Sequence, residues 1–135
     1  MAVSLRVYER SLPSGAKKWQ QKIIGVIRLD HTVKKFIFGR NEQTKYFIPN
    51  INTYTFLDPD EGEFIMGEKG MYKFADTGKN GIALRTNLSF WILNLGPRET
   101  MLEKNDLTQM KVGDQLIMRD EMARKEIVLE IIQIY

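Results

Sequence analysis

Apolar and polar residues alternate along most of the chain with a period of two, which is the spacing of a half-buried β-strand. The first segment alternates cleanly at Val3, Leu5 and Val7. The last segment, Ile127 to Ile134, alternates as well, and a change of phase near Ile131–Ile132 predicts a β-bulge there. Because both ends of the chain read as strands, we expect the termini to pair or to lie close together.

The segments between them are short, apolar or β-branched, and separated by turns roughly every 8 to 12 residues. The strand candidates are Lys22 to Leu29, Lys34 to Phe38, Tyr46 to Ile48, Asn52 to Leu57, Glu63 to Met66, Tyr72 to Phe74, Ile82 to Leu84 and Gln115 to Met118. Gly96–Pro97 is expected to break the chain, and 101–110 has room for a helical turn, but no segment sustains a helical period. The pattern predicts an all-β protein, an antiparallel sandwich or barrel of about ten to eleven short strands.

The stretch from Tyr72 to Leu84 carries this pattern most clearly. Two alternating segments flank the polar run Asp76-Thr77-Gly78-Lys79-Asn80-Gly81. Residues of these types bond their own backbone or tolerate positive φ, so the stretch predicts strand, tight loop, strand.

Length and composition narrow the class of protein. With 135 residues, the chain fits one domain spanning 1–135. It has no apolar run of the roughly 20 residues that a spanning helix needs, and no signal-like segment follows Met1. Without cysteine it can form no disulfide or thiolate site, and His31 is its single histidine. We expect an intracellular protein, cytoplasmic or nuclear, with no membrane partner and no cofactor.

Charge is unevenly divided along the chain. Residues 1–56 hold ten Lys and Arg against three Asp and Glu, whereas residues 57–135 hold ten against fourteen. The first half suits an acidic or phosphorylated partner if its charges gather on one face, and means little if they are scattered. Aromatic residues lie among these cations, so a nucleic-acid-binding protein is an alternative. The candidates for stacking on bases are Trp19, Phe36, Phe38, Tyr46 and Phe47. Against it, Phe36 and Phe38 alternate as core residues do.

Four carboxylates, Asp58, Asp60, Glu61 and Glu63, lie within six residues and could hold a hard cation or act as an acid/base pair. They lack the regular spacing of a calcium loop, and no nucleophile–base pair accompanies them. An acidic turn in solvent explains them better, so we expect neither an enzyme nor a metal site.

Three motifs, in order, resemble those of the forkhead-associated (FHA) domain family. A strand runs into Gly-Arg at Phe36-Ile37-Phe38-Gly39-Arg40, and the loop 76–81 matches an Asp-x-Ser-Thr-Asn-Gly type loop. Met110-Lys111-Val112-Gly113-Asp114 stands where the family has Leu-x-x-Gly-Asp. The resemblance extends from Val3 to Ile134 and implies an FHA-like β-sandwich, a domain that usually sits within a longer chain.

One family motif is replaced here. The phosphate-contacting Ser-Arg-x-His corresponds to Asp60-Glu61-Gly62-Glu63, followed by the apolar Phe64-Ile65-Met66. Three carboxylates at that place would repel a phosphate that serine and arginine would bind. The family's loop Ser and Thr are likewise replaced, by Gly78 and Lys79. The resemblance therefore implies a degenerate member: an interaction module, adaptor or scaffold that binds protein without needing a phosphate.

The resemblance also supplies candidate partner-binding residues: Arg40, Lys79, Asn80 and Gly81 at the loop apex. Lys79 and Arg40 could instead rebuild a phosphothreonine-peptide pocket, which is the alternative function. Structural roles also remain open: Arg40 could pair with Asp60 or Glu61, and Asn80–Gly81 could simply form a turn. Asp76 could cap its own loop through backbone N–H groups.

Two aromatic sites complete the candidates. Trp19, flanked by Lys17, Lys18 and Lys22, lies in a predicted loop and is the better exposed partner-binding residue. Phe90 and Trp91 lie in an apolar insert that could bind a partner or mediate self-association, although core packing would also explain Trp91.

Overall fold

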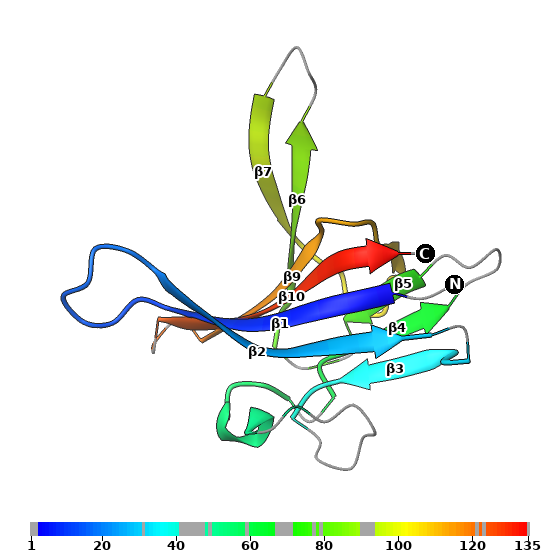
Figure 1. Ribbon diagram of the computed structural model, residues 1–135, viewed down its shortest axis with the longest axis horizontal. Helices are drawn as coiled ribbons and strands as arrows, with labels where there is room; N and C mark the ends of the chain where they lie inside the picture. Colours follow the sequence, from blue (N-terminus) through cyan, green and yellow to red (C-terminus); the bar gives the residue numbers. More distant parts are fainter. Residues whose placement is uncertain are drawn as a thin grey trace.

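Ten strands build two antiparallel sheets in the computed structural model (Figure 1). It describes residues 3–30, 32–40, 48, 50–58, 60–66, 72–76, 78, 80–89, 94–120, 122 and 124–134. The strands are β1 (Val3–Ser11), β2 (Gln20–Leu29), β3 (Lys35–Phe38), β4 (Gly62–Met66), β5 (Tyr72–Asp76), β6 (Ala83–Ser89), β7 (Asn94–Met101), β8 (Thr108–Gln109), β9 (Gln115–Asp120) and β10 (Lys125–Ile134). One sheet has the order β2-β1-β10-β9-β6-β7, and the other β3-β4-β5-β8. The predicted all-β sandwich is confirmed.

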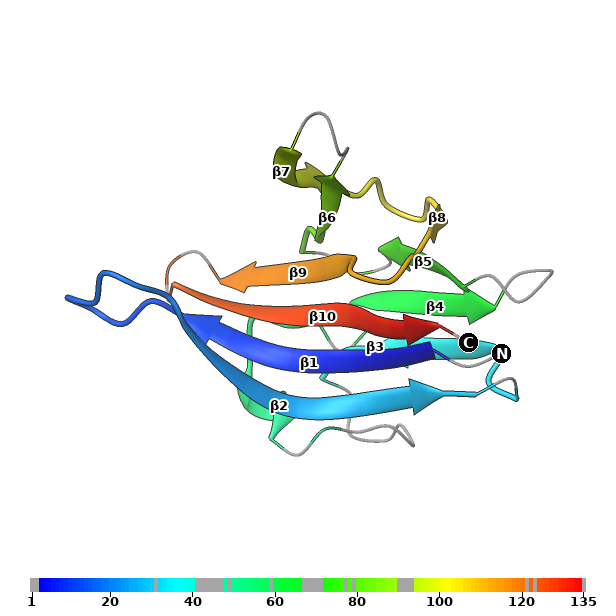
Figure 2. The ribbon, with the colours of Figure 1, turned by 45° about the horizontal axis from the view of Figure 1, so that its top comes forward.

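The first and last strands pair along their whole length, as their patterns predict. β1 runs antiparallel to β10, from Val3 opposite Ile134 to Ser11 opposite Lys125. The register shifts beside Ser4, so one residue of β10, Ile132, has no counterpart on β1. The predicted bulge is confirmed, and both ends of the described chain lie together at one end of the sandwich (Figure 2).

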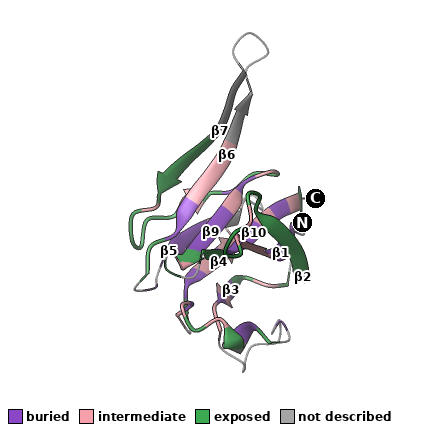
Figure 3. Cartoon of the chain, turned by 90° about the vertical axis from the view of Figure 1, so that its left-hand side faces the viewer, coloured by how far each residue is buried: buried purple, intermediate pink, exposed green. Residues whose placement is uncertain are grey.

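The core lies between the two sheets. Its buried side chains come from alternate positions of the paired strands, as half-buried strands require. In the smaller sheet Phe36, Phe64 and Phe74 form one cross-strand row, with centroid separations of 6.3 and 4.8 Å. A Cβ at Gly62 would lie 2.1 Å from the Phe74 ring, so the row needs a glycine there. In Figure 3 the buried residues mark the inner strands of the sheets, whereas the edge strand β2 is mostly exposed.

The other face of the larger sheet carries a second, smaller apolar cluster. Tyr8, Val128, Ile117 and Ala83 lie directly opposite one another across β1, β10, β9 and β6, and all are buried. Beyond β9 the β6–β7 hairpin extends away from the other four strands of this sheet (Figures 1 and 2).

The segment after β3 departs from its prediction. A strand over Asn52 to Leu57 is wrong, because the chain forms the short 3₁₀ helix η1 (Ile51–Thr53) followed by turns. Asn50 enters it with a φ of 66°, a value that asparagine tolerates better than most residues. The tight turns bury both Ile51 and Leu57, and this packing overrides the β-propensity of the residues between them. Of the predicted strand Tyr46 to Ile48, only Ile48 is described, and it is not in a strand.

Two further expectations are wrong. Gly96–Pro97 does not break the chain but lies inside β7, where Pro97 faces Asn87. Because β7 is an edge strand, a missing backbone N–H is tolerated there. Residues 101–110 hold no helical turn but the two-residue strand β8. The described residues include no helix long and apolar enough to cross a membrane.

Candidate functional site

Arg40 lies two residues after the end of β3 and is held against the segment that precedes β4. Its backbone N–H donates to the carbonyl of Asp58 (3.2 Å), and its Nε donates to the carbonyl of Leu57 (2.6 Å). The anticipated ion pair with Asp60 or Glu61 is absent among the described contacts of Arg40. The side chain nevertheless ties two parts of the loop together, through a backbone carbonyl.

Asn80 also forms hydrogen bonds with the segment that precedes β4. Its side-chain amide donates to the carbonyl of Phe56 (2.8 Å), and its backbone N–H donates to Asp58 Oδ2 (3.0 Å). Asn80 and Arg40 therefore bond neighbouring carbonyls, which brings the two predicted site residues together. In both residues a side-chain donor is therefore engaged in a hydrogen bond within the protein.

The loop carrying Asn80 is not the hairpin turn that its sequence suggests. The predicted strands on either side exist, but β5 and β6 belong to different sheets, so the loop crosses the sandwich. None of the described residues Gly78, Asn80 and Gly81 has a positive φ. Gly78 is required by close approach instead: a Cβ there would lie 2.7 Å from Asp58 Oδ2 and 2.9 Å from Glu61 Oε2.

The acidic residues before β4 do not form the exposed cluster predicted from the sequence. Glu61 is completely buried, and its backbone N–H donates to the carbonyl of Phe38 (2.7 Å). Glu63 forms an ion pair with Lys35 (3.1 Å). Of the three carboxylates that replace the family's phosphate-binding motif, only Asp60 is exposed. The prediction that these carboxylates form an acidic turn in solvent is therefore wrong for Glu61.

Glu61 is instead the centre of a buried acidic group. Its Oε1 accepts a hydrogen bond from the backbone N–H of Asp58 (2.7 Å), while its Oε2 is buried without a partner among the described residues. Burial, together with the charges of Asp58 and Asp76, raises the pKa of Glu61 to about 7, against the opposing effects of the Asp58 N–H and Lys104. Near neutral pH this carboxyl therefore retains a proton for much of the time.

Asp76, at the end of β5, completes the group. Its Oδ1 accepts a hydrogen bond from the backbone N–H of Gly78 (3.1 Å), which confirms the predicted loop cap. Its Oδ2 is buried and has no partner among the described residues. Burial raises the pKa of Asp76, although the Gly78 N–H and Lys104 act in the opposite direction. The loops are thus joined by carboxyl groups where a phosphate-binding site would present cationic ones.

Comparison with known proteins identifies the architecture. No protein-family model matches the sequence, and no curated protein does. Among solved structures, an engineered FHA domain with a Myc-pTBD peptide is similar over 96% of this chain and 91% of its own, with a TM-score of 0.55 and 19% identity. The N-terminal FHA domain of Rad53p from S. cerevisiae, in complex with a phosphothreonine peptide, covers 94% and 92%, with a TM-score of 0.53 and 20% identity. The solution structure of the yeast Rad53 FHA1 domain covers 96% and 77%, with a TM-score of 0.53 and 21% identity.

This chain has an FHA-like fold. The third motif behind the resemblance, before β9, has a structural role in that fold. Gly113 has a φ of 94°, which favours glycine, and Asp114 is buried. Asp114 accepts hydrogen bonds from the backbone N–H of Lys111 (3.0 Å) and the hydroxyl of Thr86 (2.8 Å). The Gly-Asp pair therefore forms the turn that leads into β9.

Of the remaining predicted site residues, Gly81 and Trp19 are described, and they lie on different segments of this FHA-like chain. Gly81 follows Asn80 in the crossing loop and is exposed, whereas Lys79 lies outside the described residues. Trp19 lies just before β2, at the end of the β1–β2 hairpin, and 43% of its surface is exposed. The guanidinium carbon of Arg10 is 5.4 Å from the centre of its ring. Phe90 and Trp91 lie outside the described residues.

The sequence did not reveal two features of the FHA-like structure. The buried acidic group depends on contacts between β4, β5 and the loops, and alternation gives no sign of them. A cross-strand row of charges, Arg10, Glu126 and Arg119, lies on the outer face of the larger sheet, beside Trp19. Among the described residues, no three His, Asp or Glu side chains are arranged to hold a metal ion.

Proposed function

We propose that this chain is a non-catalytic protein-interaction module that uses an FHA-like fold to bind a partner without requiring a phosphate. Two of the similar structures are FHA domains with bound peptides, one of them a phosphothreonine peptide, which supports a protein partner here. We further propose one intracellular domain spanning residues 1–135.

The observation that carries this proposal is the exposed carboxylate of Asp60 beside the buried carboxyl of Glu61, at the place of the family's phosphate-contacting motif. A phosphothreonine brings a charge of nearly −2. An ionised carboxylate ~4 Å from that phosphate, near the surface, costs about 4 kcal/mol per unit of like charge before screening by salt. Asp60 is exposed at this loop and Asp58 is partly buried beside it, whereas Glu61 adds its charge only when it has lost its proton. The electrostatics therefore favour an uncharged ligand or none.

Two of the donors that could compensate are already engaged. The Arg40 Nε and the Asn80 amide each donate to a loop carbonyl. Turning them toward a ligand would leave those carbonyls without that bond, at a net cost of roughly 1 kcal/mol each. We infer that these residues hold the loops in place, and that the partner docks on another surface, which includes the exposed Trp19.

The test is a fluorescence anisotropy titration with a degenerate phosphothreonine peptide pool and its unphosphorylated twin. Wild type, Arg40→Ala and Asn80→Ala are compared, and circular dichroism confirms that each is folded. We expect the phosphate group to add no affinity for wild-type protein. Neither substitution should therefore weaken binding of the phosphorylated pool relative to the unphosphorylated pool. Micromolar binding of the phosphorylated pool alone, abolished by Arg40→Ala, would overturn the proposal and support a rebuilt phosphothreonine pocket.

A further inference from the structure

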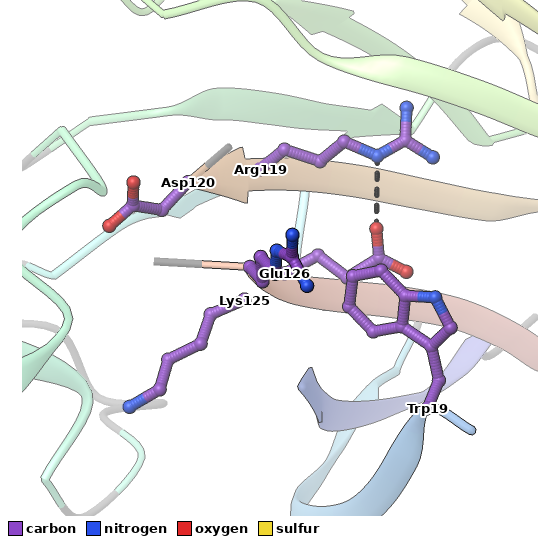
Figure 4. A pocket seen from close by; sticks show the side chains of 6 residues that line it. Trp19, Arg119, Asp120, Lys125 and Glu126 are labelled. Atoms are coloured by element: carbon purple, nitrogen blue, oxygen red, sulfur yellow. Dashed lines mark hydrogen bonds and ion pairs between the residues drawn. The ribbon is translucent and has the colours of Figure 1, made fainter. Parts of the chain in front are cut away.

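We propose that a hollow beside Trp19 binds an acidic linear segment of the partner protein, an inference that rests on the proposed function and gives it a surface and a class of ligand. The hollow has a volume of about 220 Å³ (Figure 4). It is lined by Trp19, Arg119, Asp120, Arg124, Lys125 and Glu126. None of these residues belongs to the loops that carry Arg40 and Asn80.

Two hairpin ends meet to form this hollow. Ser11 of β1 lies opposite both Gln20 of β2 and Lys125 of β10. Just beyond, the backbone N–H of Leu12 donates to the carbonyl of Arg124 (3.0 Å) and ties the two ends together. Segments more than a hundred residues apart in sequence thereby build one site on paired strands.

Trp19 is braced in position although much of its surface is exposed. The Arg10 guanidinium lies over its ring, and Arg10 Nη1 is 2.7 Å from Glu126 Oε1. Glu126 also accepts a hydrogen bond from Arg119 Nε (2.9 Å), and its side chain is only 4% exposed. Figure 4 shows the indole lying alongside the Arg119–Glu126 pair. An aromatic ring held by a charge row centred on a buried glutamate loses little freedom on binding, which favours a contact of high energy.

The charge left over in the hollow is positive. Glu126 is already shared by two arginines, whereas Arg124 and Lys125 are exposed and form no ion pair with any described residue. Exposed Lys17 and Lys18 directly precede Trp19 and add to the same end of the sandwich. A ligand with carboxylates would complement these four cations and would be drawn to them over a distance of about a Debye length.

Size and chemistry favour a peptide. The hollow is smaller than the roughly 300–1,000 Å³ of typical small-molecule sites and suits one large side chain against the indole. A single-stranded nucleic acid would need several aromatic platforms along a basic groove, but among the described residues lining this hollow Trp19 is the only aromatic one, and Asp120 and Glu126 lie in it. A peptide can place one apolar side chain on Trp19 and carboxylates toward Arg124 and Lys125.

The experiment uses a fluorescein-labelled pool of 12-residue peptides, rich in Asp and Glu around one central Leu, Phe or Trp. A matched pool carries Asn and Gln in place of the acidic residues, and a dT12 oligonucleotide is the third probe. We compare wild type with Trp19→Ala and Lys125→Glu. Lys111→Glu is the matched control, because Lys111 is exposed and its turn bonds Ile131, near the opposite end of β10. Thermal melts verify that all variants fold.

We expect the acidic pool to bind in the micromolar range and the neutral pool not to bind. Trp19→Ala and Lys125→Glu should each weaken binding about tenfold or more, and Lys111→Glu less than about twofold. Absence of binding, equal loss in Lys111→Glu and Lys125→Glu, or tighter binding of dT12 would each overturn the site. If Lys125→Glu weakens binding of the acidic pool, the site is supported. Binding of a phosphothreonine pool through Arg40 would overturn only the proposed function, and not this site.

Discussion

Glu61 makes the folding stability of this protein depend on pH in a defined direction. The carboxyl is completely buried, and its pKa is about 7 in the folded chain against an ordinary value of 4.5. Between these pH values the folded state holds a proton that the unfolded state has lost. Stability therefore falls as pH rises from about 4.5 to about 7, by about 1.4 kcal/mol per pH unit, or about 3 kcal/mol in all.

Glu61→Gln removes this proton while keeping the size of the side chain and an oxygen to accept the Asp58 N–H. We expect the variant to match wild type near pH 5 and to exceed its stability by up to about 3 kcal/mol at pH 8. Urea unfolding at pH 5, 6, 7 and 8, followed by tryptophan fluorescence, gives the difference directly.

The control is Glu63→Gln, which makes the same chemical change two residues away. It breaks the partly exposed ion pair with Lys35, so we expect it to cost less than about 1 kcal/mol. A stability difference between wild type and Glu61→Gln that stays constant from pH 5 to pH 8 would refute the reasoning. It would mean that Glu61 is solvated or paired in solution.

Three further substitutions test the loops and the outer charge row. Gly78→Ala should destabilise the fold by roughly 1–3 kcal/mol in urea, because its Cβ would collide with two carboxylate oxygens; an unchanged midpoint would contradict the close approach. Asn80→Ala should cost about 1 kcal/mol in the same assay by removing the bond to the Phe56 carbonyl, and no loss would mean that the amide is free. Arg119 and Arg85 lower the pKa of Glu99 to about 2, so its stabilisation is complete above about pH 4.5 and is lost toward pH 2. Acid unfolding of Glu99→Gln should therefore be less steep over that range than that of wild type, and parallel curves would argue against the ion pairs.

Sequence periodicity predicted the strands whose two faces differ most strongly in hydrophobicity. β1 and β10 alternate between the core and the outer face, and the change of phase near Ile132 marked a real bulge. The failures lie where tertiary contacts decide the backbone. Burial of Ile51 and Leu57 turns a segment of high β-propensity into a 3₁₀ helix, and the edge position of β7 makes Pro97 harmless.

The sequence predicted which residues form the loop apex, but not how these residues are arranged. Arg40 and Asn80 do lie together, yet they bond neighbouring backbone carbonyls, which no sequence motif indicates. Glu61 looked like part of an exposed acidic turn, because sequence spacing carries no information about which carboxylate is turned inward. Its burial depends on a glycine, Gly78, in a distant loop.

The opposite charges of the two chain halves also have a structural explanation. Three of the six ion pairs in the described residues join a cation of residues 1–56 to a carboxylate of residues 57–135: Arg6–Glu130, Arg10–Glu126 and Lys35–Glu63. The asymmetry therefore partly reflects pairing between strands. Lys17, Lys18, Arg124 and Lys125, near Trp19, form none of these three pairs, which is why the proposed site lies there.

The most direct test of the account is a two-dimensional ¹H–¹⁵N NMR titration that observes Asn80 and Trp19 together. The acidic pool and the phosphothreonine pool are added to separate samples of wild-type protein. We predict that the Trp19 indole N–H and the Lys125 amide shift, while the side-chain amide of Asn80 stays bonded and unmoved. Shifts of the Asn80 side chain and the Arg40 Nε–H with the phosphothreonine pool alone would contradict the account and restore the loop apex as a phosphate site.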